Sequence, residues 1–153
     1  MTSPARSQSV PAPIRPAPFG WRDAPLLAEA LAALARASAA IAILPFAHVA
    51  TLASARPVHA RAGHDPRDVD RVVRAVQAWA RRAPWRTVCF QKGLAVHLML
   101  RRRGIASRLH YGVSQALEKG LGAHVWVSVG DRVVIGGEEA GRFACLATYP
   151  ADG

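Results

Sequence analysis

Apolar residues recur at helical spacing along the first part of the chain. In the segments 23–45 and 65–84, leucines, alanines and valines fall three or four residues apart, as on the buried face of an amphipathic helix. Each segment opens with Asp closely followed by Pro, which suits a helix start, and each ends at a proline. The predicted buried positions are Leu26, Leu27, Leu31, Leu34 and Ala35 in the first helix and Val69, Val72, Val73, Val76 and Trp79 in the second.

A third helix is predicted over 89–103, and a glycine follows it at the position where helices commonly end. The pattern then changes to an alternation of apolar and polar residues, which is typical of strands. We expect strands at 107–113, 124–129, 132–135 and 143–149. Helices followed by a small antiparallel sheet make an α+β fold.

The length of 153 residues and the 51% of hydrophobic residues suffice for one domain with a packed core. Residues 1–20 are rich in Pro, Ser and Ala and predict a disordered tail, so we expect a single domain over 21–150. The tail lacks the basic start and apolar run of a secretory signal. The apolar stretch 39–53 is shorter than the roughly 20 residues that a bilayer span needs. These features predict a cytoplasmic protein with no integral membrane segment.

The spacing of the cysteines and the excess of arginines limit the kinds of reaction and of partner that we expect. Cys89 and Cys145 show neither a disulfide framework nor the paired spacing of a zinc site, and there is no HExxH-like histidine pair. We therefore expect no metal in the reaction. The formal charge of +10 favours an acidic partner, which on charge alone could be nucleic acid, anionic lipid or an acidic peptide. The chain shows no basic module with interleaved aromatic residues of the RNA-binding kind.

Cys89 is predicted within the first turn of the third helix. The unpaired backbone N–H groups and the dipole of a helix start stabilise an anion, which favours the thiolate. The same N–H groups could donate to an oxyanion that forms when a carbonyl is attacked. This position suits a nucleophile, although cysteine is also a common core residue.

His124 begins a strand in which the valines share one face and the histidine lies on the other. At a strand end it could reach a cleft, or it could be a partly exposed surface histidine. A role as general base for Cys89 requires the sheet to pack against the helix that starts at Cys89.

For several other polar residues the sequence favours structural roles or offers a second interpretation. His97 lies mid-helix among apolar residues and is expected to be structural, whereas His110 is an alternative base. The run 101–103 of three arginines complements the negative end of a helix dipole or contacts an acidic partner. The run 136–139 of two glycines and two glutamates predicts a turn or a close backbone approach.

Three stretches taken together resemble the lasso-peptide biosynthesis leader peptidases. They are Ala-Pro-Trp-Arg-Thr-Val-Cys at 83–89, Leu-Arg-Arg-Arg-Gly-Ile at 100–105 and Ala-His-Val-Trp-Val at 123–127. The resemblance extends over roughly 26–149. It implies a transglutaminase-like fold, related to papain-like cysteine proteases, and a Cys-His-Asp triad in which Cys89 matches the nucleophile and His124 the base.

The third triad position is not matched. In many relatives an Asp stands near the end of the strand after the hairpin, a position that falls here at Gly136. Asp131 is a poor replacement, since about seven residues at about 3.3 Å each carry it roughly 20 Å from His124. Glu138 is a weaker candidate that would have to bend back, and a backbone carbonyl could also orient the imidazole.

The resemblance implies hydrolysis of one peptide bond between leader and core during maturation of a ribosomal peptide natural product, without a cofactor. It implies three partners: the precursor peptide, a separate leader-recognition protein and an ATP-dependent lasso macrocyclase. Nucleic acid is not expected among them.

Three alternatives remain open. Acyl transfer by the same thiol would make the chain a true transglutaminase-like enzyme, and a catalytically silent peptide-binding module would fit the missing Asp at Gly136. The last is a basic nucleic-acid binder, which would bind with strong salt dependence.

Overall fold

The computed structural model describes residues 18–55, 63–114 and 122–150, so the expected tail at 1–20 lies almost wholly outside the described residues. The helical elements are η1 (Trp21–Asp23), α1 (Ala24–Ile43), α2 (Phe46–Ser54), α3 (Pro66–Ala80), α4 (Cys89–Arg102) and the one-turn α5 (Gly137–Ala140). The strands are β1 (Arg108–Ser114), β2 (Gly122–Val129), β3 (Arg132–Ile135) and β4 (Ala144–Tyr149). The predicted α+β order is confirmed.

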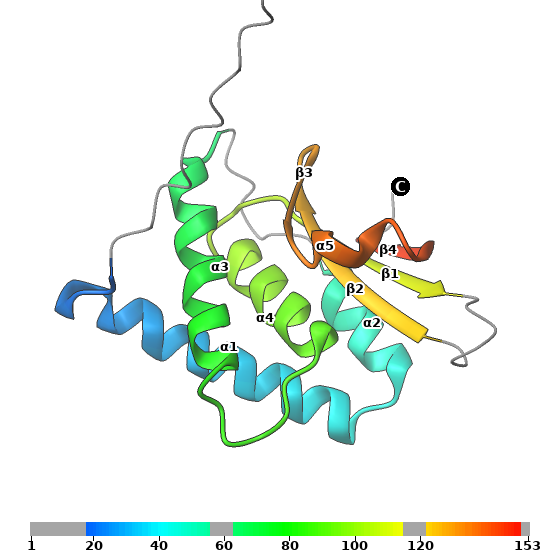
Figure 1. The fold of residues 1–153 in the computed structure, drawn as a ribbon, viewed down its shortest axis with the longest axis horizontal. Coiled ribbons are helices and arrows are strands. Elements are labelled where there is room, and N and C mark those ends of the chain that lie inside the picture. The colour runs from blue at the N-terminus through cyan, green and yellow to red at the C-terminus, as the bar shows by residue number, and fades with distance from the viewer. Residues whose placement is uncertain (1–17, 56–62, 115–121, 151–153) are drawn as a thin grey trace, which may run out of the picture.

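Helix α4 lies at the centre of the described structure. Figure 1 shows it between α3 and the sheet, with α1 packed across both α3 and α4. Its buried residues face both neighbours: Gly93, Leu94, Ala95, Val96, His97, Met99 and Leu100. The helix ends as predicted, because Gly104 has a φ of +71° and its N–H donates to the carbonyl of Arg101.

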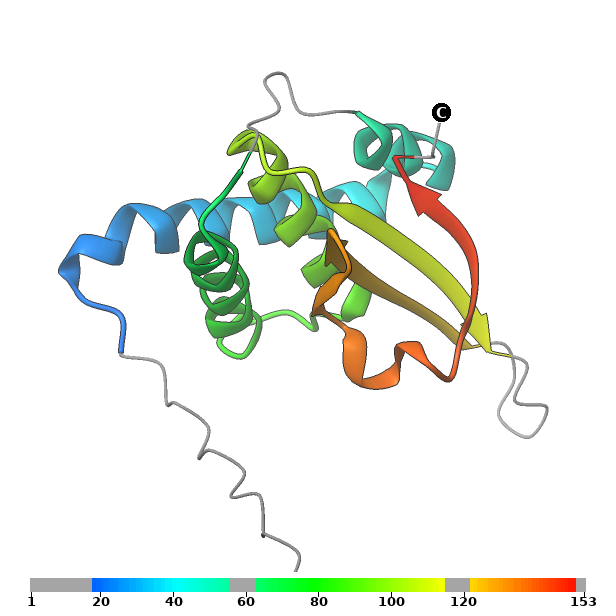
Figure 2. The same ribbon diagram turned by 90° about the horizontal axis from the view of Figure 1, so that it is seen from above.

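The sheet is antiparallel with the strand order β3-β2-β1-β4. β1 pairs with β2 from Gly122 to Ser128, whereas β3 pairs only with 127–129. Within the described residues, the first half of β2 therefore has one edge without a strand neighbour. Figure 2 shows α5 on the side of β2 opposite α1, next to this edge.

Gly93 sets the distance between α4 and the sheet. A Cβ at this position would lie 2.8 Å from Cγ1 of Val125, closer than side-chain atoms approach each other. Gly93 lies one helical turn after Cys89, so this contact brings the first turn of α4 against the start of β2. The packing that a Cys89–His124 pair requires is thus present.

Three details of the sequence prediction are wrong. Asp23 does not cap α1 with its side chain; its carboxylate accepts from the N–H of Gly20 at 2.9 Å and from Arg71 at 2.6 Å. Ala35 is exposed, because the buried stripe of α1 runs through Ala30, Leu34 and Ala37. α3 ends at Ala80, four residues before Pro84, so the proline does not end this helix. β2 is buried on both faces from His124 onward.

Among the described residues, one helical stretch is long and apolar enough to cross a membrane. It is the 23-residue stretch Trp21–Ile43, with a mean hydropathy of 1.8 in its most apolar window, of which 17% is buried. Core helices of soluble proteins satisfy the same criterion, and α1 packs against α3 and α4. The expectation of no integral membrane segment stays a prediction.

Candidate functional site

A cleft of about 580 Å³ lies where the first turn of α4 meets the open edge of β2. Cys89 and His124 both line it, so the structure brings the two sequence-predicted site residues to one cavity. The other lining residues come from α3, from the start of α4, from β2 and β3, and from the segment around α5: Gln77, Val88, Lys92, Ala123, Val125, Ile135, Gly136, Glu138, Glu139 and Phe143.

Cys89 is the first residue of α4, as predicted. The extended backbone of Val88 precedes it, and the N–H of Val88 donates to the Gln91 side chain at 2.6 Å, which fixes the helix start. The thiol is free and half-buried. The N–H groups of a first helical turn have no acceptor within the helix, so the main chain at Cys89 and Phe90 offers donors beside the sulfur.

His124 is buried, with 7% of its surface exposed, so the interpretation as a surface histidine is wrong. Its Nε2 lies 2.8 Å from the carbonyl oxygen of Gly136. A carbonyl can only accept, so the neutral ring carries its proton on Nε2 and leaves Nδ1 as the unprotonated nitrogen. Phe143 and Trp126 stack on the ring at centroid distances of 5.0 and 6.1 Å and hold its plane.

The main-chain carbonyl of Gly136 binds the His124 ring, which is the role that the resemblance assigns to an Asp side chain. Gly136 has a φ of +78°, and a Cβ there would lie 2.6 Å from the carbonyl oxygen of Val125. In this backbone conformation no side chain fits at position 136, which includes that of Asp. The imidazole is therefore oriented by the main chain of the residue whose side chain is missing.

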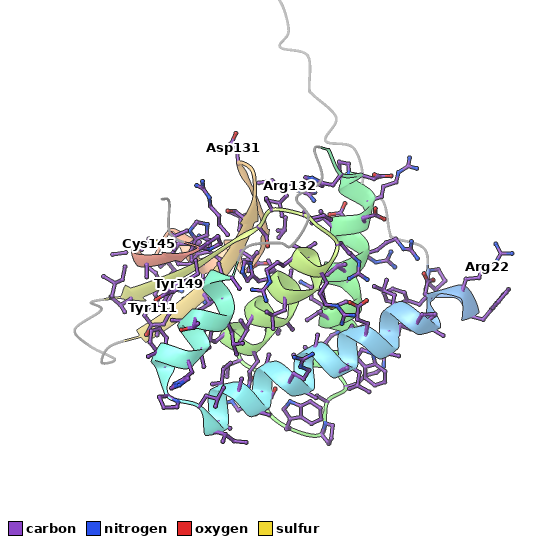
Figure 3. The ribbon with its side chains drawn as sticks, turned by 180° about the vertical axis from the view of Figure 1, so that it is seen from behind. Arg22, Tyr111, Asp131, Arg132, Cys145 and Tyr149 are labelled. Atoms are coloured by element: carbon purple, nitrogen blue, oxygen red, sulfur yellow. The ribbon has the colours of Figure 1, made fainter. Side chains whose placement is uncertain are left out.

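Neither acidic alternative contacts His124 among the described residues. Glu138 lines the cleft but is exposed. Asp131 is exposed at the tip of the β2–β3 hairpin, where Figure 3 shows it pointing away from the body of the domain. These positions agree with the expectation that Asp131 is a poor replacement for the missing acid.

In His97 of the core and in His110 of the sheet, both ring nitrogens lie within hydrogen-bond distance of a partner. His97 is buried, with Ser107 Oγ 2.8 Å from Nδ1 and the carbonyl oxygen of Ala53 2.9 Å from Nε2. Burial lowers the pKa of His97 below its usual range, which keeps the ring neutral. The prediction of a structural role is confirmed.

His110 does not line the cleft, so it is poorly placed as an alternative base. Its Nδ1 lies 3.0 Å from Oγ1 of Thr148 and its Nε2 lies 2.8 Å from Oγ of Ser128. The ring also stacks on Trp126, with ring centroids 5.5 Å apart. These contacts join strands β1, β2 and β4 on one face of the sheet.

Two members of the arginine run at the end of α4 hold other helices. Arg101 donates to the carbonyls of Leu52 and Ala55, which close the end of α2. Arg103 forms two hydrogen bonds with the carboxylate of Glu29 on α1, at 2.9 and 2.5 Å. These arginines are engaged inside the fold, which favours the structural expectation over contact with a partner.

Sequence reasoning missed Gln77, Lys92 and Phe143 as cleft residues. Gln77 lies on α3 beside buried valines and resembles an ordinary polar position of an amphipathic helix. One signal was present: Lys92 falls three residues after Cys89, on the same side of a helix. Phe143 is placed by the tertiary fold, for which the local sequence has no signal.

A cysteine at a helix start that shares a cleft with a strand-borne, oriented histidine is the arrangement of thiol enzymes. The family model of the Transglutaminase-like superfamily matches residues 30–148. The chain belongs to this superfamily, whose members are generally cysteine peptidases or transglutaminases. Neither the curated proteins nor the solved structures that were searched contained a match.

Proposed function

We propose that this protein is a cysteine peptidase that removes the leader from a lasso-peptide precursor. The observation that carries the chemical part is the hydrogen bond between His124 Nε2 and the Gly136 carbonyl, which leaves Nδ1 free to take a proton in the cleft that Cys89 lines. The substrate class rests on the resemblance of 83–89, 100–105 and 123–127 to the leader peptidases.

In the proposed reaction, Nδ1 of His124 takes the proton of the Cys89 thiol, and the sulfur attacks the carbonyl carbon of the scissile bond. The oxyanion that forms accepts hydrogen bonds from the first-turn N–H groups of α4. Gln77 lines the same cleft and supplies a side-chain amide as a further donor. The tetrahedral intermediate expels the amine, which receives the proton from Nδ1, and leaves a thioester on Cys89.

Water then resolves the thioester. Nδ1 of His124 removes a proton from the water, which attacks the thioester carbonyl. The second tetrahedral intermediate then expels the Cys89 sulfur, which takes the proton back from Nδ1, and the acid product is released. An amine in place of water would give acyl transfer instead, which is the alternative activity within the superfamily. Product mass separates the two, since hydrolysis adds water and transfer adds the amine.

A silent binding module has less support than the sequence alone suggested. Its best argument was the absence of an Asp at Gly136, and the carbonyl of that residue holds the imidazole in its place. The proposal includes the precursor peptide, a separate leader-recognition protein and an ATP-dependent macrocyclase as cytoplasmic partners.

The test is mass spectrometry of a candidate precursor incubated with the purified chain and its recognition partner. We expect cleavage at one leader–core bond that is lost in Cys89→Ala and in His124→Ala. Cys145→Ala and His48→Ala, which alter an exposed cysteine and an exposed histidine outside the cleft, should cleave like the wild type. Cleavage that survives in Cys89→Ala would exclude the mechanism.

A further inference from the structure

A second hollow, also of about 580 Å³, lies along α3. It is lined mainly by Phe19, Arg74, Gln77, Ala78, Arg81 and Arg82. Arg74, Gln77 and Ala78 lie on α3, with Gln77 and Ala78 one turn after Arg74, and Arg81 and Arg82 directly follow the last residue of the helix. Gln77 also lines the catalytic cleft, and the two hollows therefore adjoin at this residue.

The charged side chains that line this hollow are all positive. Three arginines line it, and no Asp or Glu does so among the described residues. Several arginines elsewhere in this domain have carboxylate partners, such as Asp23 for Arg71 at 2.6 Å and Asp70 for Arg132 at 2.9 Å. Within the described residues, Arg81 and Arg82 have no such partner.

Two contacts shape the hollow for a bound carboxylate. The guanidinium of Arg74 lies over the Phe19 ring, 4.8 Å from its centroid, which gives the site an apolar wall. Arg82 donates to the carbonyl of Ala78 at 3.2 Å, which draws its head toward the helix. Guanidinium groups present planar pairs of donors that match a carboxylate.

The cleft has the opposite charge at its other wall. Glu138 and Glu139 of α5 line it, and Figure 1 shows α5 and α3 on opposite sides of α4. Glu139 also lies 3.7 Å from Arg142. A peptide that crosses the cleft would thus meet acidic side chains at one wall and, beyond Gln77, arginines. This difference gives an extended substrate a preferred direction.

We propose that the α3 hollow is a subsite for an acidic segment of the peptide substrate, a few residues from the bond that Cys89 attacks. The inference deepens the proposed function and rests on it. It also transfers the expected contact with an acidic partner from the run 101–103, in which Arg101 and Arg103 are engaged inside the fold, to the hollow along α3.

The binding test uses the full chain with Cys89→Ala, so that nothing is cleaved. The probe is a short fluorescein-labelled peptide in which Glu alternates with Gly and Ser, compared at low salt with its Gln counterpart. We expect the Glu peptide to bind more tightly, and the double variant Arg81→Gln/Arg82→Gln to weaken its binding roughly three- to tenfold. The double variant Arg36→Gln/Arg67→Gln removes the same charge from exposed positions outside the hollow and should bind like the parent.

Equal weakening in both double variants would overturn the subsite, because it would reflect net charge alone. Tighter binding of an oligothymidylate of equal charge would also overturn it and indicate a nucleic-acid surface. If the Glu peptide binds as expected but no precursor is cleaved, the leader-peptidase function fails and the acidic-peptide site stands. If precursor is cleaved with the same KM by the wild type and by Arg81→Gln/Arg82→Gln, the function stands and the subsite fails.

Discussion

The two ends of α4 use polar residues in opposite ways. At the C-terminal end, both ring nitrogens of His97 are bonded, and Arg101 and Arg103 donate to carbonyls and a carboxylate. At the N-terminal end, His124 has one nitrogen bonded, and Cys89 begins the helix with unpaired main-chain donors beside it. A histidine with both ring nitrogens hydrogen-bonded stabilises the fold, whereas an oriented ring with one unbonded nitrogen can accept and donate a proton.

Both ends depend on glycine, but for different reasons. Gly104 ends α4 with a positive φ, and Gly93 allows the first half of the helix to approach the sheet. Gly136 combines the two requirements, with a positive φ and a close backbone neighbour. The N-terminal end is therefore sensitive to single added methyl groups.

Gly136→Ala should break the N-terminal arrangement most completely. Its Cβ would lie 2.6 Å from the carbonyl oxygen of Val125 and must displace the segment that orients His124. We expect a loss of activity on the order of a hundredfold or more and a loss of stability of about 1–3 kcal/mol. Steady-state kinetics and urea denaturation measure the two effects.

Gly130→Ala is the matched control. Gly130 also has a positive φ, +56°, but a Cβ there has nothing within 4 Å. It should cost about 1 kcal/mol of stability from backbone strain alone and leave activity unchanged. Equal activity in the two variants would show that the Gly136 carbonyl does not position the base.

Gln77→Ala tests whether the side-chain amide of Gln77, on α3, donates to the oxyanion together with the N–H groups at the start of α4. Loss of one oxyanion donor typically costs about a hundredfold or more in kcat, and KM should change little. Gln77→Glu keeps the shape of the side chain but replaces the donor with a carboxylate, so it should be at least as damaging. A change confined to KM would place Gln77 in substrate binding alone.

Gly93→Ala should separate the helix from the sheet. Because the added Cβ would lie 2.8 Å from Cγ1 of buried Val125, we expect a loss of about 1–3 kcal/mol in the free energy of unfolding, measured by urea denaturation. The same change in a Val125→Ala background should cost less, since the opposing methyl group is gone. Additive costs in the double variant would contradict direct contact as the cause.

The sequence predicted the helices because their signals are local. Asp65 caps α3 as expected by accepting from the N–H of Arg67 at 2.8 Å. α1 ends just before Pro45 and α4 just before Gly104, as predicted, whereas α3 ends at Ala80, four residues before Pro84. Asp23 has the same local appearance, but Arg71 and the N–H of Gly20 bind its carboxylate. A partner 48 residues away has no signature in the local sequence.

The site was predictable only in part for the same reason. A cysteine at a helix start and a histidine on a strand are residue-type signals that the sequence displays. The orienting group is a main-chain carbonyl of Gly136, and main-chain oxygens occur at every position. Gln77 enters the cleft because α3 packs beside α4, which depends on the tertiary structure.

The smallest expected effect is a dependence of stability on pH that arises from His97, in the second half of α4. Its pKa is lowered in the folded protein, chiefly by burial, so below about 6.5 the unfolded chain takes up the proton first. Stability is thus fully present above that pH and decreases as the pH falls through the lower, folded pKa. A tenfold difference in proton affinity between the folded and unfolded chains corresponds to about 1.4 kcal/mol.

Urea denaturation between about pH 7.5 and 5 should therefore show a decreasing free energy of unfolding. Above pH 5 the carboxylates with lowered pKa, Asp23 and Glu29, contribute little, because their usual values are 3.8 and 4.5. His97→Gln should be less stable at neutral pH and show a smaller decrease over this range. An equal decrease in the variant would mean that another group takes up the proton, and that the bonds to Ser107 and Ala53 do not select the neutral ring.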